Sequence, residues 1–282
     1  MPEKAIAERI DFSKSEQYTL SIRLSTDGFS FSVYNPIHES SISFSLSYFS
    51  QEIESGTSMA ANVKELLKSD ILQYTYKRVN VLLVTRRFTL IPLELAEDEE
   101  QYRTVFYYNH SMQENEKVLC NDLRKAYVKV AFGMDKSAWQ QLSERYPAAH
   151  FYSQVSPLIE HFAGKCRLGN SKKMYVYVRG NSLDVFCFDR GRLLLANSFD
   201  CKQVDDCIYY LLYVWKQLDY NQERDELHLV GFFNDKEKLN SGLKQFVRQV
   251  FIINPKSEFT RQGVAKLEDI PYDLQTLTLC EL

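Results

Sequence analysis

Residue types that commonly do chemistry occur in this chain, but not at the spacings of the well-known enzyme motifs. No His-Glu-x-x-His motif and no close His/Cys pair is present, which disfavours a zinc site. The sequence also lacks a Cys-x-x-Cys pair, a Gly-x-Ser-x-Gly turn and a Walker loop. The histidines are His38, His110, His150, His161 and His228, and the cysteines are Cys120, Cys166, Cys187, Cys201, Cys207 and Cys280. Local sequence therefore names no catalytic residue and no metal ligand.

Charge and hydropathy exclude two classes of partner. The 282 residues carry a net charge of −3, and no segment collects many Lys or Arg, so nucleic-acid binding through a broad basic face is disfavoured. No apolar run approaches the length of a membrane span, and the N-terminal segment has no signal-peptide core. We expect a cytoplasmic protein with reduced cysteines.

The first elements that would position a site lie in residues 18–34, YTLSIRLSTDGFSFSVY. Apolar and polar residues alternate on both sides of Asp27-Gly28, which predicts two strands joined by a tight turn. A third alternating strand follows at 42–48, then an amphipathic helix at 59–67. Residues 79–84 are almost all apolar, as in a buried parallel strand. The order is three strands, a helix and a strand.

The same order returns about 150 residues later. Residues 174–188, MYVYVRGNSLDVFCF, again predict a strand, a polar turn and a strand. A third strand at 192–199, an amphipathic helix at 204–218 and a strand at 227–232 complete the series. Shared order and shared lengths indicate a duplicated architecture.

Additional material separates the two halves. A strand at 88–93 is expected to pair with the strand at 81–84 through Thr85-Arg86-Arg87. A helix near 97–109 follows, then a hairpin of 117–120 with 126–132 that turns at Asn121-Asp122.

These elements divide the chain into three parts. We predict an N-terminal tail over 1–17, a first lobe over 18–168 and a second lobe over 169–282. An insertion at about 86–133 belongs to the first lobe. The fold class is α/β.

The segments YTLSIRLSTDGFSFSVY and YVRGNSLDVFCFDRGRLLLANSFDCKQVDDCIYYLLYVWKQL resemble an uncharacterised bacterial family with the actin-like ATPase fold. The likeness covers nearly the whole chain from about Tyr18. It implies two ribonuclease H-like lobes, each with a mixed five-stranded sheet and helices. The family brings no established activity, so the resemblance informs the fold more than the function.

Active members of the wider actin-like superfamily hold ATP and magnesium between the lobes, and the resemblance indicates where the equivalent loops lie. The first phosphate loop normally reads Asp-x-Gly, whereas Asp27 and Gly28 are adjacent here. The second corresponds to Gly180-Asn181-Ser182, which lacks the acidic residue. The adenosine loop keeps one glycine, Gly231, where paired glycines are usual. If nucleotide binds, the resemblance implies Asp27, Gly28, Asn181, Ser182 and Gly231 as its contacts.

Two functions follow. The first is a non-catalytic scaffold or partner-binding module with degenerate nucleotide loops, no cofactor and a protein partner. The alternative is a divergent ATP-binding protein or ATPase that uses the interlobe cleft with magnesium, with a small-molecule kinase as a third reading. A cleft closed by Phe29, Phe31, Phe232 or Phe233 would favour the scaffold, and open polar loops with a free carboxylate would favour an enzyme.

One predicted helix is unusually aromatic. It carries Tyr102, Phe106, Tyr107 and Tyr108, too many large rings for one narrow buried stripe. Part of the set either forms a contact surface or is buried by the inserted hairpins, and the sequence leaves both readings open.

Overall fold

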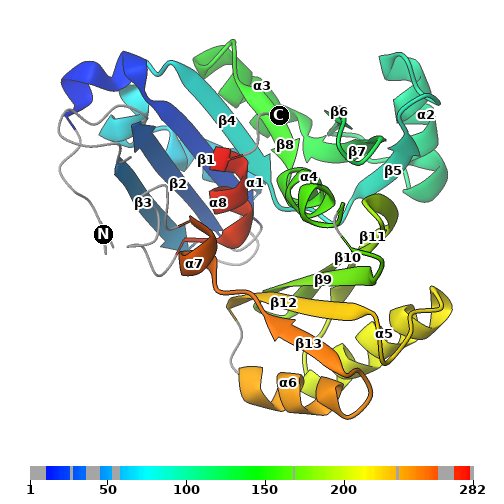
Figure 1. Ribbon diagram of the computed structural model, residues 1–282. Helices are drawn as coiled ribbons and strands as arrows, with labels where there is room; N and C mark the ends of the chain where they lie inside the picture. The colour runs from blue at the N-terminus through cyan, green and yellow to red at the C-terminus, as the bar shows by residue number, and fades with distance from the viewer. Residues whose placement is uncertain are drawn as a thin grey trace.

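The computed structural model describes residues 11–25, 28–35, 45–52, 58–167, 169–232, 235–259 and 270–279 (Figure 1). Two lobes are visible, each built around a twisted five-stranded sheet. The predicted fold class, α/β with two ribonuclease H-like lobes, is confirmed.

The first sheet has the strand order β3-β2-β1-β4-β8. The strands are β1 (Thr19–Ser25), β2 (Gly28–Asn35), β3 (Ser45–Glu52), β4 (Arg78–Leu83) and β8 (His150–Ser153). β1 is antiparallel to β2 and parallel to β4, which makes the sheet mixed. Leu20, Ile22 and Leu24 alternate along β1 and are fully or almost fully buried, because the period of two places them on one face of the sheet.

The second sheet repeats that order as β11-β10-β9-β12-β13. Its strands are β9 (Lys172–Arg179), β10 (Ser182–Asp189), β11 (Arg192–Asp200), β12 (Glu226–Phe232) and β13 (Gln249–Ile252). α5 (Val204–Gln217) and α6 (Lys236–Lys244) contribute apolar side chains to a core that also contains alternate residues of β9 and β10. The duplication predicted from the order of elements is therefore real at the level of topology.

Short helices complete the first lobe: η1 (Phe12–Gln17), α1 (Met59–Leu66), η2 (Asp70–Gln73) and α3 (Lys136–Arg145). η1 lies within the segment that the sequence predicts to be a tail. The Phe12 ring stacks on Tyr74 with 5.0 Å between ring centroids, so the described end of that segment is packed against the lobe.

The insertion forms a sheet of its own, with the order β5-β7-β6, and two expectations for it are wrong. Its elements are β5 (Phe88–Pro92), α2 (Glu99–Asn109), β6 (Glu116–Leu123) and β7 (Val128–Asp135). β5 pairs with β7 and not with β4, because both edges of β4 are already occupied by β1 and β8. Asn121 and Asp122 lie inside β6, and the turn follows at 124–127.

The side chain of Asn121 connects the inserted sheet to the first sheet. Its amide nitrogen donates to the Phe151 carbonyl oxygen at 2.8 Å, and its amide oxygen accepts from the Ser153 backbone N–H at 3.1 Å. The turn residue Tyr127 adopts a positive φ of 56°. A polar residue with turn propensity is therefore used here for a tertiary contact.

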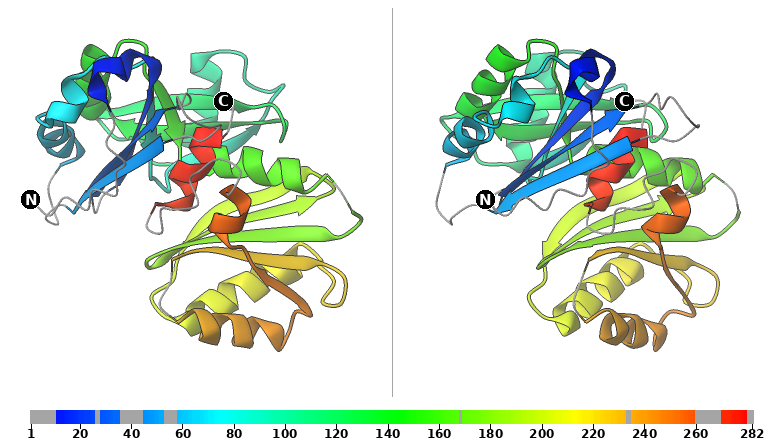
Figure 2. Two further views of the ribbon diagram at one scale, coloured as in Figure 1. Left: turned by 60° about the vertical axis from the view of Figure 1, so that its left-hand side comes forward. Right: turned by 90° about the vertical axis from the view of Figure 1, so that its left-hand side faces the viewer.

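Two helices fill the space between the lobes (Figure 2). α4 (Val155–Lys165) follows β8, and α8 (Tyr272–Leu279) lies near the C-terminus after the short α7 (Pro255–Phe259). The Phe162 ring stacks on Tyr175 of β9 with 4.2 Å between centroids, and α8 also contacts β1. The C-terminal segment thus returns from the second lobe to the first.

The two large sheets fall within the predicted ranges 18–168 and 169–282, whose exact boundaries stay a prediction. α8, which the sequence reading did not anticipate, lies in the second range but packs against the first sheet. In the described part of the chain, no helix is long and apolar enough to cross a membrane.

Candidate functional site

A cleft of about 830 Å³ lies where the two lobes meet. Its first-lobe wall includes the ends of β1 and β4 and the turn that follows β4. Its second-lobe wall includes the β9–β10 turn and the end of β12. These are the places where the actin-like fold would hold a ligand, so the cleft is the candidate site.

The structure brings some of the predicted nucleotide contacts together at this cleft. Asn181 and Ser182 line it. Gly28 pairs with Ser25, which also lines the cleft, but Gly28 itself does not. Asp27 lies outside the described residues.

Gly231 is not among the lining residues and has a structural reason to be glycine. Its φ is +112°, and a Cβ at this position would lie 2.2 Å from the Val178 carbonyl oxygen. Close packing of β12 against β9 therefore requires glycine here.

The phenylalanines beside the predicted loops do not all fill the cleft. Phe29 and Phe31 pair with Leu24 and Ile22 across the hairpin, and they are buried in the first-lobe core. Phe232 lines the cleft but remains 56% exposed. Phe233 lies outside the described residues. The described phenylalanines thus leave the cleft open.

The acidic residues that line the cleft in the described chain are Glu116 and Asp135, and both carboxylates are engaged. Glu116 accepts from Arg87 Nε at 2.7 Å and from Arg87 Nη2 at 2.8 Å. Asp135 caps α3 by accepting from the Ala138 backbone N–H at 2.7 Å, and it accepts from the Asn115 amide at 2.8 Å. Within the ranges that the structure describes, no three His, Cys, Asp or Glu residues cluster as metal ligands would.

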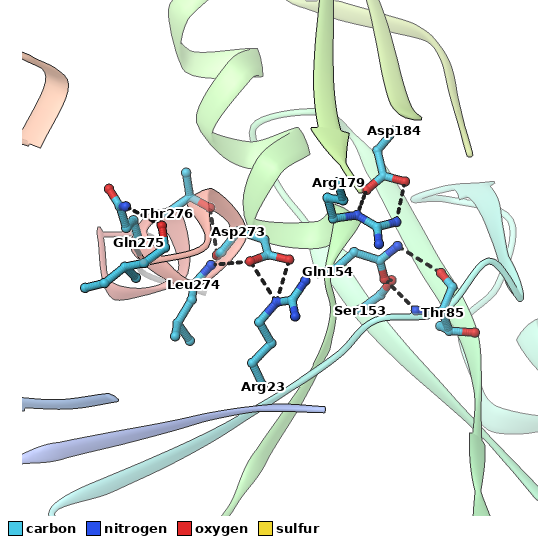
Figure 3. A network of polar contacts seen from close by, with 11 residues as sticks. Arg23, Thr85, Ser153, Gln154, Arg179, Asp184, Asp273, Leu274, Gln275 and Thr276 are labelled. Carbon is cyan, nitrogen blue, oxygen red and sulfur yellow. Dashed lines mark hydrogen bonds and ion pairs between the residues drawn. The ribbon is translucent and has the colours of Figure 1, made fainter. Parts of the chain in front are cut away.

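Two buried ion pairs flank the cleft, and neither is among the residues predicted from the sequence (Figure 3). Arg23 of β1 donates from Nε to both carboxylate oxygens of Asp273 of α8, at 3.0 Å each. Arg179 of β9 donates from Nε and Nη2 to Asp184 of β10, at 2.8 and 3.0 Å. Both aspartate side chains are fully buried. The available signal was a charged residue within a strand that is otherwise buried.

Gln154 fixes the turn that follows β4 (Figure 3). Its buried amide oxygen accepts from the Thr85 backbone N–H at 3.0 Å, and its amide nitrogen donates to the Thr85 carbonyl oxygen at 2.9 Å. Arg86, which follows Thr85 in the turn, forms an exposed ion pair with Asp200 at the end of β11. Gln154 therefore fixes the turn within the first lobe, and Arg86 links the turn to the second lobe.

Burial dominates the pKa of Tyr177, which lies on β9 two residues before Arg179 and lines the cleft. It raises the pKa of the Tyr177 hydroxyl, and Asp273 acts in the same direction, whereas Arg23 and Arg179 oppose it. Tyr177 is therefore neutral at physiological pH. The site offers arginine N–H groups, a neutral hydroxyl and backbone groups, but no free carboxylate among the described residues.

Comparison with known proteins shows the fold and the family. A Bacteroides thetaiotaomicron protein with the actin-like ATPase fold and unknown function is 55% identical, over 97% of this chain and 100% of that one, with a TM-score of 0.84. A chain of the PilM–PilN type IV pilus biogenesis complex is 14% identical, over 93% and 97% of the two chains, with a TM-score of 0.52, which shows the fold alone. Curated proteins give no match. The family model for DUF3822, "Protein of unknown function", matches residues 7–250, and the chain belongs to that family.

Proposed function

We propose that this protein is a cytoplasmic, non-catalytic scaffold of actin-like fold that binds another protein and turns over no nucleotide. The observation that carries the proposal is the state of the cleft carboxylates. Both acidic residues that line the described cleft are already hydrogen-bonded, one to an arginine and one to a helix N-terminus.

Nucleotide hydrolysis in this fold needs a carboxylate for magnesium and a group that orients the attacking water. Glu116 has a side chain that is only 4% exposed, and it holds Arg87. Releasing it for a metal would leave Arg87 without its carboxylate, which costs several kcal/mol for a largely buried pair. The described cleft residues thus favour a role without ATP or magnesium.

Two exposed aromatic groups support a role in protein binding. Tyr209 and Tyr213 of α5 are 64% and 51% exposed, and their rings stack with 6.2 Å between centroids. On α2 both readings of the aromatic set hold in part, because Phe106 is fully buried while Tyr108 is 83% exposed. Exposed tyrosines are enriched at protein interfaces. The PilM–PilN complex, in which a protein of this fold is bound to another, supports the proposal by analogy of fold.

The alternative is a divergent ATP-binding protein or ATPase. The open cleft of about 830 Å³ favours it, since the described phenylalanines do not fill that space. It would use Asp27, Gly28, Asn181, Ser182 and Gly231 around ATP and magnesium.

Magnesium dependence separates the two functions. We expect ATP with magnesium to raise the melting temperature no more than ATP with EDTA, and phosphate release to stay at the level of a heat-inactivated sample. A magnesium-dependent rise that disappears in Asp27→Ala would overturn the scaffold proposal. Loss of a captured partner in Tyr209→Ala/Tyr213→Ala, but not in the control Tyr127→Ala, would locate the binding surface. Tyr127 is a suitable control because it is 72% exposed in the turn between β6 and β7, on the first lobe's insertion and not on α5.

A further inference from the structure

We propose that Arg23 and Arg179 together bind the phosphate group of a small organic phosphate in the interlobe cleft, without a metal ion. This inference goes beyond the scaffold role and does not depend on it. Both arginines line the cleft, one from each lobe, at the ends of equivalent hairpins.

A buried aspartate fixes the position of each arginine. The Asp273 and Asp184 side chains are fully buried, whereas each arginine side chain is 15% exposed. The aspartates therefore lie on the protein side of each guanidinium group, and the exposed part of each arginine faces the cleft. Such support reduces the side-chain entropy that an arginine loses when it binds a ligand.

The ion pairs leave donors unused. A guanidinium group has five N–H bonds. Arg23 contacts Asp273 through Nε, and Arg179 contacts Asp184 through Nε and Nη2. In the part of the chain that the structure describes, both Nη atoms of Arg23 and Nη1 of Arg179 have no hydrogen-bond partner. Two guanidinium edges are thus available to a phosphate, which accepts pairs of N–H bonds well.

The two charges are close enough to affect each other. Burial disfavours the charged form of Arg23, the Asp273 carboxylate raises its pKa above the ordinary value, and Arg179 acts against that rise. A phosphate monoester has three terminal oxygens that can accept N–H bonds from both guanidinium edges, whereas a carboxylate has two, which favours the phosphate. These N–H groups would bind the phosphate directly, without a magnesium ion.

The rest of the cleft suits an organic group. Apolar side chains of Leu83, Val84, Met134 and Phe232 line it, and about 830 Å³ exceeds what a phosphate ion alone would occupy. The apolar lining would bury a ring or chain attached to the phosphate.

The test is calorimetric titration in EDTA at constant ionic strength, with inorganic phosphate and phenyl phosphate as probes. We expect phenyl phosphate to bind, and to bind about tenfold more tightly than inorganic phosphate, because its ring reaches the apolar wall. Arg179→Lys keeps the charge but loses the planar fork, and we expect it to weaken phenyl phosphate binding by about tenfold. Arg23→Lys should weaken phenyl phosphate binding to the same extent. It tests the site independently if Arg179→Lys does not fold.

Arg86→Lys is the matched control. Arg86 lines the same cleft, but its side chain is 50% exposed and pairs with Asp200, so this substitution should leave affinity nearly unchanged. Absence of binding at millimolar probe, or binding only with magnesium, would overturn the site. Equal affinity for both probes would overturn the assignment to an organic ligand. An equal loss in Arg86→Lys would show that any arginine of the cleft contributes to binding, and would overturn the specific site at Arg23 and Arg179.

Discussion

The β1–β2 and β9–β10 hairpins occupy equivalent places in the two lobes, and each supplies an arginine whose partner is a buried aspartate. In the second lobe the partner, Asp184, lies five residues from Arg179 on the same hairpin. In the first lobe the partner, Asp273, lies 250 residues from Arg23 on α8. The second hairpin can therefore complete its ion pair locally, whereas the first depends on the return of the C-terminal segment.

The two sheets also differ at one pair of equivalent strand positions. Val178 of β9 pairs with Gly231, and Leu24 of β1 pairs with Leu83. Leu83 contributes an apolar side chain to the first-lobe core, while Gly231 permits close approach of two backbones. The same topology is therefore compatible with an apolar side chain at this position in the first sheet and with a glycine in the second.

The largest effect should come from removing either buried aspartate. Asp273→Ala and Asp184→Ala should each lower the free energy of unfolding by about 3–5 kcal/mol, because each leaves a largely buried arginine without its carboxylate. Urea denaturation measures this loss. The two variants should differ in the region that unfolds locally. The rate of backbone hydrogen exchange should rise in α8 for Asp273→Ala and in β10 for Asp184→Ala. Equal exchange patterns would contradict the contrast between the local and the long-range pair.

The attachment of the C-terminal segment should depend on pH. Burial alone would raise the pKa of Glu258 on α7, but hydrogen bonds from His161, Lys165 and Tyr272 lower it to about 2. A carboxylate with a lowered folded-state pKa stabilises the fold above its ordinary pKa near 4.5, and that stability is lost as the pH falls toward 2. The contribution is about 3 kcal/mol. His161, whose pKa burial lowers, acts in the same direction at higher pH, because its protonation is disfavoured in the folded protein.

Denaturation between pH 6 and pH 3 measures this slope, and Glu258→Gln is the comparison. The variant should be less stable at neutral pH and should lose less stability on acidification. A wild-type slope that persists unchanged in Glu258→Gln would show that other groups hold the C-terminal segment.

Two glycines of the second lobe provide the next contrast. Gly231→Ala should lower stability by about 2 kcal/mol or more, since its φ is +112° and the new Cβ meets the Val178 carbonyl oxygen. Gly180→Ala should cost only about 1 kcal/mol, because its φ is +49° and the space around it is open. Thermal unfolding compares them. A larger loss of stability for Gly180→Ala would mean that the tighter backbone contact is in the β9–β10 turn and not between β12 and β9.

The smallest effect should come from the exposed pair that joins the lobes at the rim of the cleft. Arg86 and Asp200 have side chains that are 50% and 56% exposed, so Arg86→Gln should change stability by less than about 1 kcal/mol, and less still at high salt. Chemical denaturation at two salt concentrations measures it. A loss comparable to that of Asp184→Ala would mean that this exposed pair stabilises the protein as much as a buried pair does.

The strands of both lobes and their order along the chain could be predicted because each strand shows its own pattern. Alternation identifies the hairpin strands, and a continuous apolar run identifies β4 as buried on both faces. The pairing of β5 could not be read in this way. Its own residues do not reveal that both edges of β4 are occupied, so the nearest strand in sequence was the natural but wrong partner.

The candidate site was predictable only in its loops. Asn181 and Ser182 follow from the resemblance to the actin-like fold, which indicates a loop of the site there. Arg23, in contrast, lies on the polar face of β1, which alternation alone assigns to solvent. That face is buried, and its residue Ser21 is 1% exposed. α8 contacts β1, and no local pattern in β1 indicates that a helix far along the chain will lie there.

The sequence by itself determined the duplicated α/β architecture, the hairpin that opens each lobe and the family, because strand periodicity, turn chemistry and the quoted segments are local properties of the chain. Tertiary structure alone decided which charges meet. Arg23 pairs with Asp273 because α8, far along the chain, packs against β1, and the buried carboxylate requires its arginine because an unpaired charge in the interior is unstable.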